Sequence, residues 1–337
     1  MDKKKQMNFN LNNFLLSVSD ILDFRDIEKN NTTKHHSKRV AYIALKIGEQ
    51  LNLDPKQMFA LCAYSLFHNY IDKENCITLG VYDDMGILTK IVNYSHNIDE
   101  TYRKDKIFIP SKEILPTYKQ FDEIFLEISK PQYFWLDLQN EGSILQYIYS
   151  TLYDMTTQPT YEDVLNITSI FGNLYEDTKP FLEKCEKMTD FYQFDYKDKI
   201  TFLIAASLIN FGKLNISSKL LEKKEKITKI ELEEIKSNVY YNQKALQNIY
   251  EFENISRWAT IHQEKLDSNG YPFCLKASQL SLKDRLMGCL NIYNSLISNK
   301  AYRDAYSHQK AIEIMKELGQ KEEIDLSIVN NIASIFE

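Results

Sequence analysis

Apolar residues recur at three- and four-residue spacing through most of the chain, and this pattern constrains the fold more than any other feature. The clearest example is the stripe formed by Val40, Ile43, Ala44, Ile47 and Leu51. Such spacing places the apolar side chains on one face of an α-helix. The chain has only 9 glycines and 7 prolines in 337 residues, so few tight turns are expected. Because no segment alternates polar and apolar residues convincingly, we expect an all-α fold.

Helix-start motifs and one polar segment suggest how the chain is organised. A Ser, Thr or Asp side chain can accept hydrogen bonds from the free backbone N–H groups of a first helical turn. Such motifs precede apolar stripes at Asp54-Pro55, Thr160-x-x-Asp163, Thr228-x-x-Glu231 and Ser281-x-x-Asp284. The polar segment 154–160 contains Pro159 and is expected to be a linker. It separates a predicted domain over 1–154 from a second over 160–325.

Charge and cysteine content exclude several classes of protein. The net charge is −6, so the chain has no basic excess with which to bind a nucleic-acid polymer. The 5 cysteines are scattered without CxxC spacing, which indicates a reducing compartment rather than a disulfide framework. No apolar segment approaches the length that spans a bilayer, and the N-terminus lacks the apolar core of a signal peptide. We therefore expect a cytoplasmic protein with no membrane partner.

A series of motifs follows in a specific order through the second half. They are Ala206–Lys213, Leu220–Glu231, His262–Pro272, Asn291–Leu296 and Lys300–Arg303. Between about Phe171 and Leu318 this order resembles an HD-GYP domain, a branch of the HD phosphohydrolase superfamily. The resemblance implies an α-helical bundle that binds several iron or manganese ions and hydrolyses cyclic dinucleotides such as cyclic di-GMP. In such a site, His and carboxylate ligands hold metals that activate water and polarise the phosphoryl group.

Most metal-ligand positions implied by this resemblance carry other residues here. Only His262 is kept, and the other positions fall on Thr178, Ile209, Asn210, Asn238, Gln263 and Asn291. One imidazole cannot hold a catalytic metal pair, and Asn lacks the charge that offsets a dication. A possible ligand-binding set remains, comprising Lys213, His262, Glu264, Gly270, Tyr271, Pro272, Tyr302 and Arg303. These residues either bind a phosphate ligand or serve the structure of turns and helix contacts, and we favour the structural interpretation.

The first half resembles a second, shortened HD unit, so the chain as a whole resembles a tandem-HD protein. The matching segments are His36–Val40, Phe67–Asn69 and Tyr94–Asp99. The segment with the middle histidine ligands is expected to be deleted between about Cys76 and Asp84. The fold prediction is therefore two tandem HD-like helical bundles, the first of them shortened.

This resemblance implies a metal site in the first half formed by His36, His68 and His96, with Asp99 behind them. Three imidazoles can hold Zn(II) or Fe(II) with open coordination positions, and a carboxylate can orient one of the rings. The alternative is that these histidines are hydrogen-bonded between helices without a metal, and we favour this alternative.

Three functions remain open, and we expect the first. It is a noncatalytic HD-GYP-like regulatory or protein-interaction module derived from a cyclic-dinucleotide phosphodiesterase. Such a module would have no catalytic residue and no cofactor, and would bind another protein or a second copy of itself. The second is a metal-free receptor for cyclic di-GMP or a nucleotide, which would use Lys213, Tyr271 and Arg303. The third is a residual metal-dependent phosphohydrolase with a single transition metal in the first half.

Overall fold

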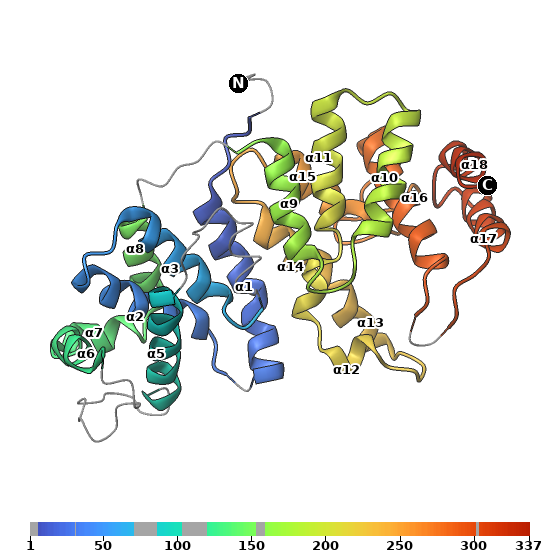
Figure 1. Cartoon of the computed structure of the whole chain (residues 1–337). Helices are drawn as coiled ribbons and strands as arrows, with labels where there is room; N and C mark the ends of the chain where they lie inside the picture. Colours follow the sequence, from blue (N-terminus) through green and yellow to red (C-terminus); the bar gives the residue numbers. More distant parts are fainter. Residues whose placement is uncertain (1–5, 31, 71–85, 103–119, 153–158, 301–302) are drawn as a thin grey trace. The chain divides into compact units, whose positions relative to one another are not determined.

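The protein is α-helical throughout its described parts (Figure 1). The computed structural model describes residues 6–30, 32–70, 86–102, 120–152, 159–300 and 303–337. Within these ranges there is no β-strand, and the only bridges are isolated ones that join Gln6 to Thr160 and Lys300 to Arg303. The all-α prediction is confirmed. The predicted deletion between Cys76 and Asp84 lies outside the described residues.

The chain divides into two compact units. The N-terminal unit is Asn10–Thr157, and the C-terminal unit combines Met1–Phe9 with Gln158–Glu337. Residues 6–9 contact the C-terminal unit, for example through the hydrogen bond from the Met7 N–H to the Pro159 carbonyl, 3.0 Å long. The domain limits at 154 and 160 stay predictions, and residue 154 lies outside the described ranges.

The N-terminal unit is a bundle arranged around helix α2. Its helices are α1 (Leu11–Asn30), α2 (His36–Gln50), α3 (Pro55–Phe67), α5 (Gly86–Tyr102), α6 (Asp122–Ile128), α7 (Gln132–Asp137) and α8 (Glu141–Thr151). Helix α2 packs against α3, α5 and α8. Its apolar stripe from Val40 to Ile47 is fully buried, which explains the spacing seen in the sequence. Helix α3 begins at Asp54-Pro55 as predicted, and the Asp54 side chain accepts the Gln57 N–H.

Aromatic packing anchors the end of α5. Tyr102, the last residue of this helix, lies against Trp135 with ring centroids 5.2 Å apart, and Phe125 also contacts Trp135. The Trp135 indole donates a hydrogen bond to the Ser129 carbonyl at 2.7 Å, so its polar group is satisfied although the ring is buried. These contacts hold α5 against its neighbours within the same unit.

The C-terminal unit is a second helical bundle. Its helices are α9 (Tyr161–Gly172), α10 (Lys179–Phe191), α11 (Tyr196–Ser207), η2 (Phe211–Asn215), α12 (Ser218–Leu221), α13 (Lys229–Lys236), α14 (Asn238–Leu246), α15 (Glu253–Thr260), η3 (Ile261–Gln263), η4 (Ala277–Gln279), α16 (Leu282–Leu296), α17 (His308–Gln320) and α18 (Leu326–Ile335). Helix α11 packs against α9, α10 and α15. The predicted helix starts at Thr160, Thr228 and Ser281 are confirmed, and each of them is a capping box.

Gly212 allows η2 to lie directly against α14. A Cβ atom at this position would fall 2.0 Å from the Asn238 carbonyl oxygen and 2.9 Å from the Asn242 backbone nitrogen. Only glycine fits so close to another backbone without a shift of one element. This approach brings Lys213, the next residue, beside the start of α14.

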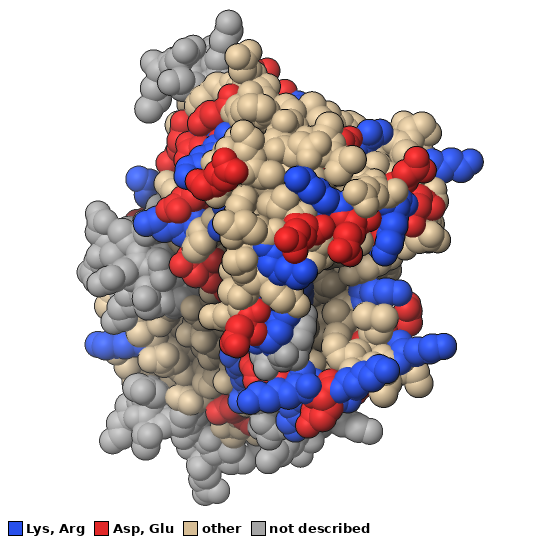
Figure 2. Space-filling model, turned by 90° about the vertical axis from the view of Figure 1, so that its right-hand side faces the viewer, with Lys and Arg blue, Asp and Glu red and all other residues tan. Residues whose placement is uncertain are grey.

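The surface carries charges of both signs. On the face that Figure 2 shows, Lys and Arg side chains are interspersed with Asp and Glu side chains, in agreement with the small net charge. None of the helices in the described ranges combines the length and the apolar character needed to cross a membrane.

Candidate metal centre

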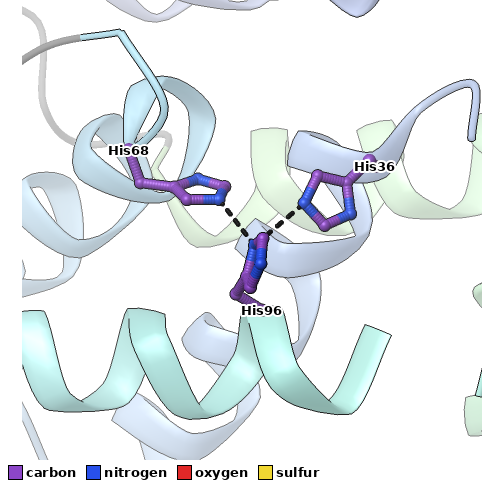
Figure 3. Close-up of side chains that lie close together, drawn as sticks. All are labelled: His36, His68 and His96. Atoms are coloured by element: carbon purple, nitrogen blue, oxygen red, sulfur yellow. Dashed lines mark hydrogen bonds between the residues drawn. The ribbon is translucent and has the colours of Figure 1, made fainter. Parts of the chain in front are cut away.

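Three histidines from three separate helices meet in the N-terminal unit (Figure 3). His36 is the first residue of α2, His68 follows the last residue of α3, and His96 lies within α5. His36 Nε2 lies 3.1 Å from His96 Nδ1, and His68 Nε2 lies 2.9 Å from the same atom. One nitrogen from each ring lies within 4.8 Å of the other two. The fold therefore brings together three residues that span 60 positions of the chain.

The outer nitrogens of two of these rings are held by hydrogen bonds. His36 Nδ1 donates to Asp99 Oδ2 at 2.7 Å, and His68 Nδ1 donates to the Ser65 carbonyl at 2.7 Å. On His96, Nε2 faces the Glu100 carboxylate at 3.6 Å. A carbonyl or carboxylate oxygen only accepts, so these contacts favour a proton on each outer nitrogen.

With the outer nitrogens protonated, the neutral rings turn three lone pairs toward one another. A direct contact between two such nitrogens needs a proton, and the preferred tautomers leave none between His36, His68 and His96. A cation shared by the three nitrogens resolves this conflict, because each lone pair then has an acceptor. Neutral imidazole is also the form that binds metals. The donor set therefore fits a metal ion.

Burial keeps two of the imidazoles, those of His68 and His96, neutral. Burial lowers the pKa of His68 to about 3. Burial, together with the nearby His36 ring, also lowers the pKa of His96. His36 is fully buried, whereas the His96 side chain is 25% exposed. The cluster is therefore closed on the side of α2 and accessible from the side of α5.

Asp99 is hydrogen-bonded to His36 on one side and to Arg39 on the other. Burial raises the pKa of Asp99, but hydrogen bonds from His36 and Arg39 outweigh it, and the pKa falls below its ordinary value. Arg39 donates to Asp99 through Nε at 2.5 Å and Nη2 at 2.9 Å. Asp99 is therefore a carboxylate that holds the His36 ring in one orientation. The sequence analysis missed Arg39 and Glu100, although their spacing of three and four residues from a site histidine places them on the same helix face.

A second group in the same unit, Asp20, His35 and Glu141, also has metal-ligand composition. The ammonium of Lys38 already lies among these groups, in contact with Asp20 and 3.3 Å from both Asp23 and Glu141. Burial alone would lower the pKa of Lys38, but the carboxylates, Asp23 first, raise it above its ordinary value. The negative charges therefore have a cation partner already, and this group is an ion-pair network.

In the C-terminal unit, His262 is the one histidine kept at a ligand position of the HD-GYP resemblance, and no second imidazole faces it in the described residues. His262 is buried, its Nδ1 donates to the Ala259 carbonyl at 2.9 Å, and its Nε2 has no hydrogen-bond partner in the described residues. Burial, and then the charge of Lys213, lower its pKa to about 3. Lys213 lies over the Tyr175 ring, 5.1 Å from the centroid, and burial lowers its own pKa to about 8.

Other positions of the predicted C-terminal site carry amides that are bonded elsewhere. The Asn238 amide donates to the Ile235 carbonyl at 2.5 Å, and the Asn210 amide donates to Glu176. Both groups of potential metal ligands found among the described residues lie in the N-terminal unit. The structure therefore brings together His36, His68, His96 and Asp99, and places the charge of Lys213 near His262.

The Gly-Tyr-Pro segment is held by Glu264. The Glu264 carboxylate accepts the N–H of Phe273 at 2.7 Å and that of Leu275 at 2.9 Å. Gly270 lies so close to this residue that a Cβ atom would fall 2.4 Å from the Glu264 Cα. The loop that includes Tyr271 and Pro272 therefore folds back onto Glu264.

Arg303 caps the C-terminal end of helix α16 with its side chain. Its guanidinium donates to the Ser295 carbonyl at 2.7 Å and to the Leu296 carbonyl at 3.0 Å. Carbonyls at the last turn of a helix have no partner within the helix, and a cation there is favourable. Tyr302, the neighbouring residue of the predicted ligand set, lies outside the described residues. Ligand binding by this set stays a prediction.

Comparisons with known proteins identify relatives of the chain. A family model described as HD domain matches residues 159–328. The 3'3'-cGAMP-specific phosphodiesterase 3 of Vibrio cholerae is 29% identical over 159 residues, which cover 45% of this chain and 35% of that protein. The cyclic di-GMP phosphodiesterase PdeB of Borreliella burgdorferi is 33% identical over 132 residues, 38% of this chain and 35% of that protein. The chain thus matches about a third of the length of these relatives.

A solved structure supports the same fold over the whole chain. The crystal structure of a cyclic GMP-AMP specific phosphodiesterase from V. cholerae, V-cGAP3, superposes with a TM-score of 0.53. The sequence identity is 14%, and the match covers 98% of each chain. At this identity the likeness concerns the fold alone.

These relatives overturn the expected noncatalytic function. They are named for phosphodiesterase activity, so the prediction of a noncatalytic interaction module is wrong. That prediction gave most weight to the metal ligands that are missing from each half. The geometry instead gathers the lone pairs of the first-half histidines at one point. Because the family model covers half of the sequence and the bundle is helical throughout its described parts, the chain belongs to the HD domain family.

Proposed function

We propose that the chain is a metal-dependent phosphodiesterase with its metal held by His36, His68 and His96. The observation that carries the proposal is the convergence of one nitrogen from each of three imidazoles, two of which have their other nitrogen hydrogen-bonded to an acceptor. A protein that used these rings only to join helices would need a proton in each contact. The preferred tautomers leave no proton in the contact between His36 and His96 or in that between His68 and His96.

The donor set suits one first-row transition metal ion. Three neutral imidazoles are typical ligands of Zn(II) and Fe(II), and three protein ligands leave positions open for water and substrate. Such an ion acts as a Lewis acid on a phosphate ester and lowers the pKa of a water molecule. The His96 side of the cluster is partly exposed, which gives a substrate access to it.

The neighbouring side chains orient the ligands and can move protons. Asp99, itself held by Arg39, keeps the His36 Nδ1 proton in place, so that His36 Nε2 presents its lone pair. The Glu100 carboxylate is 43% exposed beside His96 and can accept a proton from an attacking water molecule. Hydrolysis adds one water across a P–O bond, with the hydroxyl on phosphorus and the proton on the leaving alcohol.

The names of the relatives support a cyclic dinucleotide as the substrate. Two of them are named for 3'3'-cGAMP and cyclic di-GMP, which share the 3'–5' phosphodiester linkage. The family model matches the C-terminal unit. The metal site in the N-terminal unit is therefore supported by the positions of its three histidines and not by the family match. Binding of another protein, or of a second copy of the chain, stays a prediction.

A turnover assay on the full chain tests the proposal. The protein is prepared without a histidine tag, loaded with Mn(II), Fe(II) or Zn(II), and incubated with cyclic di-GMP and with 3'3'-cGAMP. We expect linear dinucleotide or mononucleotide products, and we expect His68→Ala to abolish them. The matched control is His262→Ala, which removes a buried imidazole from the other unit and should retain turnover. Absence of turnover in every metal form, or loss in His262→Ala but not in His68→Ala, would contradict the proposal.

A further inference from the structure

A buried carboxylate on α1 lies behind the histidine cluster. Asp26 is fully buried, and the structure gives its side chain three hydrogen-bond donors. Oδ1 accepts from Asn30 Nδ2 at 2.9 Å and from Asn69 Nδ2 at 3.1 Å, and Oδ2 accepts from Ser37 Oγ at 3.1 Å. Asp26 is outside the group of possible ligands, so any effect on a metal acts through other residues.

Two of these donors are direct neighbours of site histidines. Ser37 follows His36 at the start of α2, and Asn69 follows His68 after the end of α3. The N–H of His35, on the other side of His36, also donates to α1, at Asp23 Oδ2 (3.2 Å), but Asp26 is the carboxylate that bonds both segments. One carboxylate therefore ties together the two chain segments that supply two of the three imidazoles.

The charge of Asp26 has no cationic partner among the described residues. All three of its hydrogen-bond donors are neutral, and a buried carboxylate without a cation is costly. A dication held by the three histidines would offset this negative charge.

We propose that Asp26 is a positioning residue of the histidine centre, which fixes the segments of His36 and His68 and favours a divalent cation there. This inference rests on the proposed metal site. It adds a residue from a helix that supplies no ligand. Loss of a partner behind a metal ligand typically weakens metal binding by roughly 10- to 100-fold.

Cobalt titration of the metal-free full chain tests the inference. Co(II) binding is followed by its visible absorption and by calorimetry, and the fold of each metal-free variant is followed by circular dichroism and melting. We expect Asp26→Asn to weaken Co(II) binding by about 10-fold or more and to shift the absorption bands. Glu28→Gln, which removes a carboxylate two residues along the same helix that pairs with Arg25 instead of with Ser37 or Asn69, should bind Co(II) like the unmodified chain.

Two further variants decide the question if Asp26→Asn does not fold. Ser37→Ala and Asn69→Ala each keep the Asp26 charge and remove one of its contacts, and each should weaken Co(II) binding. Equal Co(II) affinity in these folded variants and in the unmodified chain would overturn the positioning role while leaving the metal site. No Co(II) binding by the unmodified chain would overturn the metal site and the positioning role together.

Discussion

His68 in the N-terminal unit and His262 in the C-terminal unit make the same hydrogen bond through Nδ1, but their Nε2 atoms face different groups. In each, Nδ1 donates to the carbonyl three residues earlier, at 2.7 Å for His68 and 2.9 Å for His262. Burial lowers the pKa of both rings to about 3. His68 Nε2 faces a second imidazole, whereas His262 Nε2 has no partner in the described residues and lies near the charge of Lys213.

This comparison separates the orientation of a histidine from the formation of a metal site. Local helix geometry is enough to fix one ring and its tautomer. A metal site additionally needs other helices to bring lone pairs to the same point and to keep positive charge away. The N-terminal unit meets both conditions, and the C-terminal unit places a lysine where a dication would be repelled. The family match and the candidate chemistry therefore lie in different units.

The largest expected effect comes from removing one ring in each unit. His68→Ala should weaken Co(II) binding by more than the roughly 10- to 100-fold that loss of an outer-shell partner causes, because a direct ligand is lost. His262→Ala should leave Co(II) affinity unchanged. Calorimetric titration of both variants measures the difference. Equal losses in the two variants would remove the distinction between the two units.

The next effect concerns the support behind His36. Asp99→Asn keeps an acceptor oxygen but removes the charge that Arg39 and His36 share, and we expect metal affinity to fall by roughly 10- to 100-fold. The C-terminal unit offers a matched control in Asp284→Asn, since Asp284 is a buried carboxylate that pairs with Arg257 at 2.7 Å. Unchanged affinity in Asp99→Asn would show that the ring orientation does not depend on this carboxylate.

A smaller effect is expected at Glu264, on stability alone. Gln in its place can accept only one of the two backbone N–H groups, from Phe273 or from Leu275, and we expect a loss of about 1–3 kcal/mol in the free energy of unfolding. Urea unfolding measures it, with the exposed surface change Glu313→Gln as the control. A loss of metal binding or turnover in folded Glu264→Gln protein would instead favour the ligand-binding interpretation of this residue.

The smallest effect is a pH dependence at Lys213. Burial lowers its pKa from 10.5 to about 8, so between these pH values the unfolded chain binds more protons than the folded one. Stability therefore rises with pH across this window. Lys213→Met should reduce the rise and increase Tm at pH 7, which thermal unfolding at a series of pH values can measure. A lower Tm at pH 7 would show that the ammonium stabilises the unit.

The sequence predicts the helices better than it predicts the site. Apolar spacing and capping residues such as Thr228 act within one helix, so their effect can be read from neighbouring positions. The histidine cluster depends on the crossing of α2, α3 and α5, which no local pattern encodes. The resemblance named His36, His68, His96 and Asp99, but it could not show that their lone pairs converge.

Residues that lie far apart in the sequence were the hardest to find. Asp26 acts on Ser37 and Asn69 through hydrogen bonds that span 11 and 43 positions. Nothing in the sequence around Asp26 distinguishes it from the other acidic residues of its helix. Only its complete burial, with neutral donors around it, shows that its charge requires an explanation.

The metal content of the purified chain tests the central claim most directly. Elemental mass spectrometry on tag-free protein should find about one transition metal ion per chain, as expected for a single site of three imidazoles. The same measurement on His36→Ala should find the metal lost, and on His262→Ala it should find the metal retained. Substoichiometric metal in the unmodified chain, or metal that persists in His36→Ala, would contradict a metal centre in the N-terminal unit.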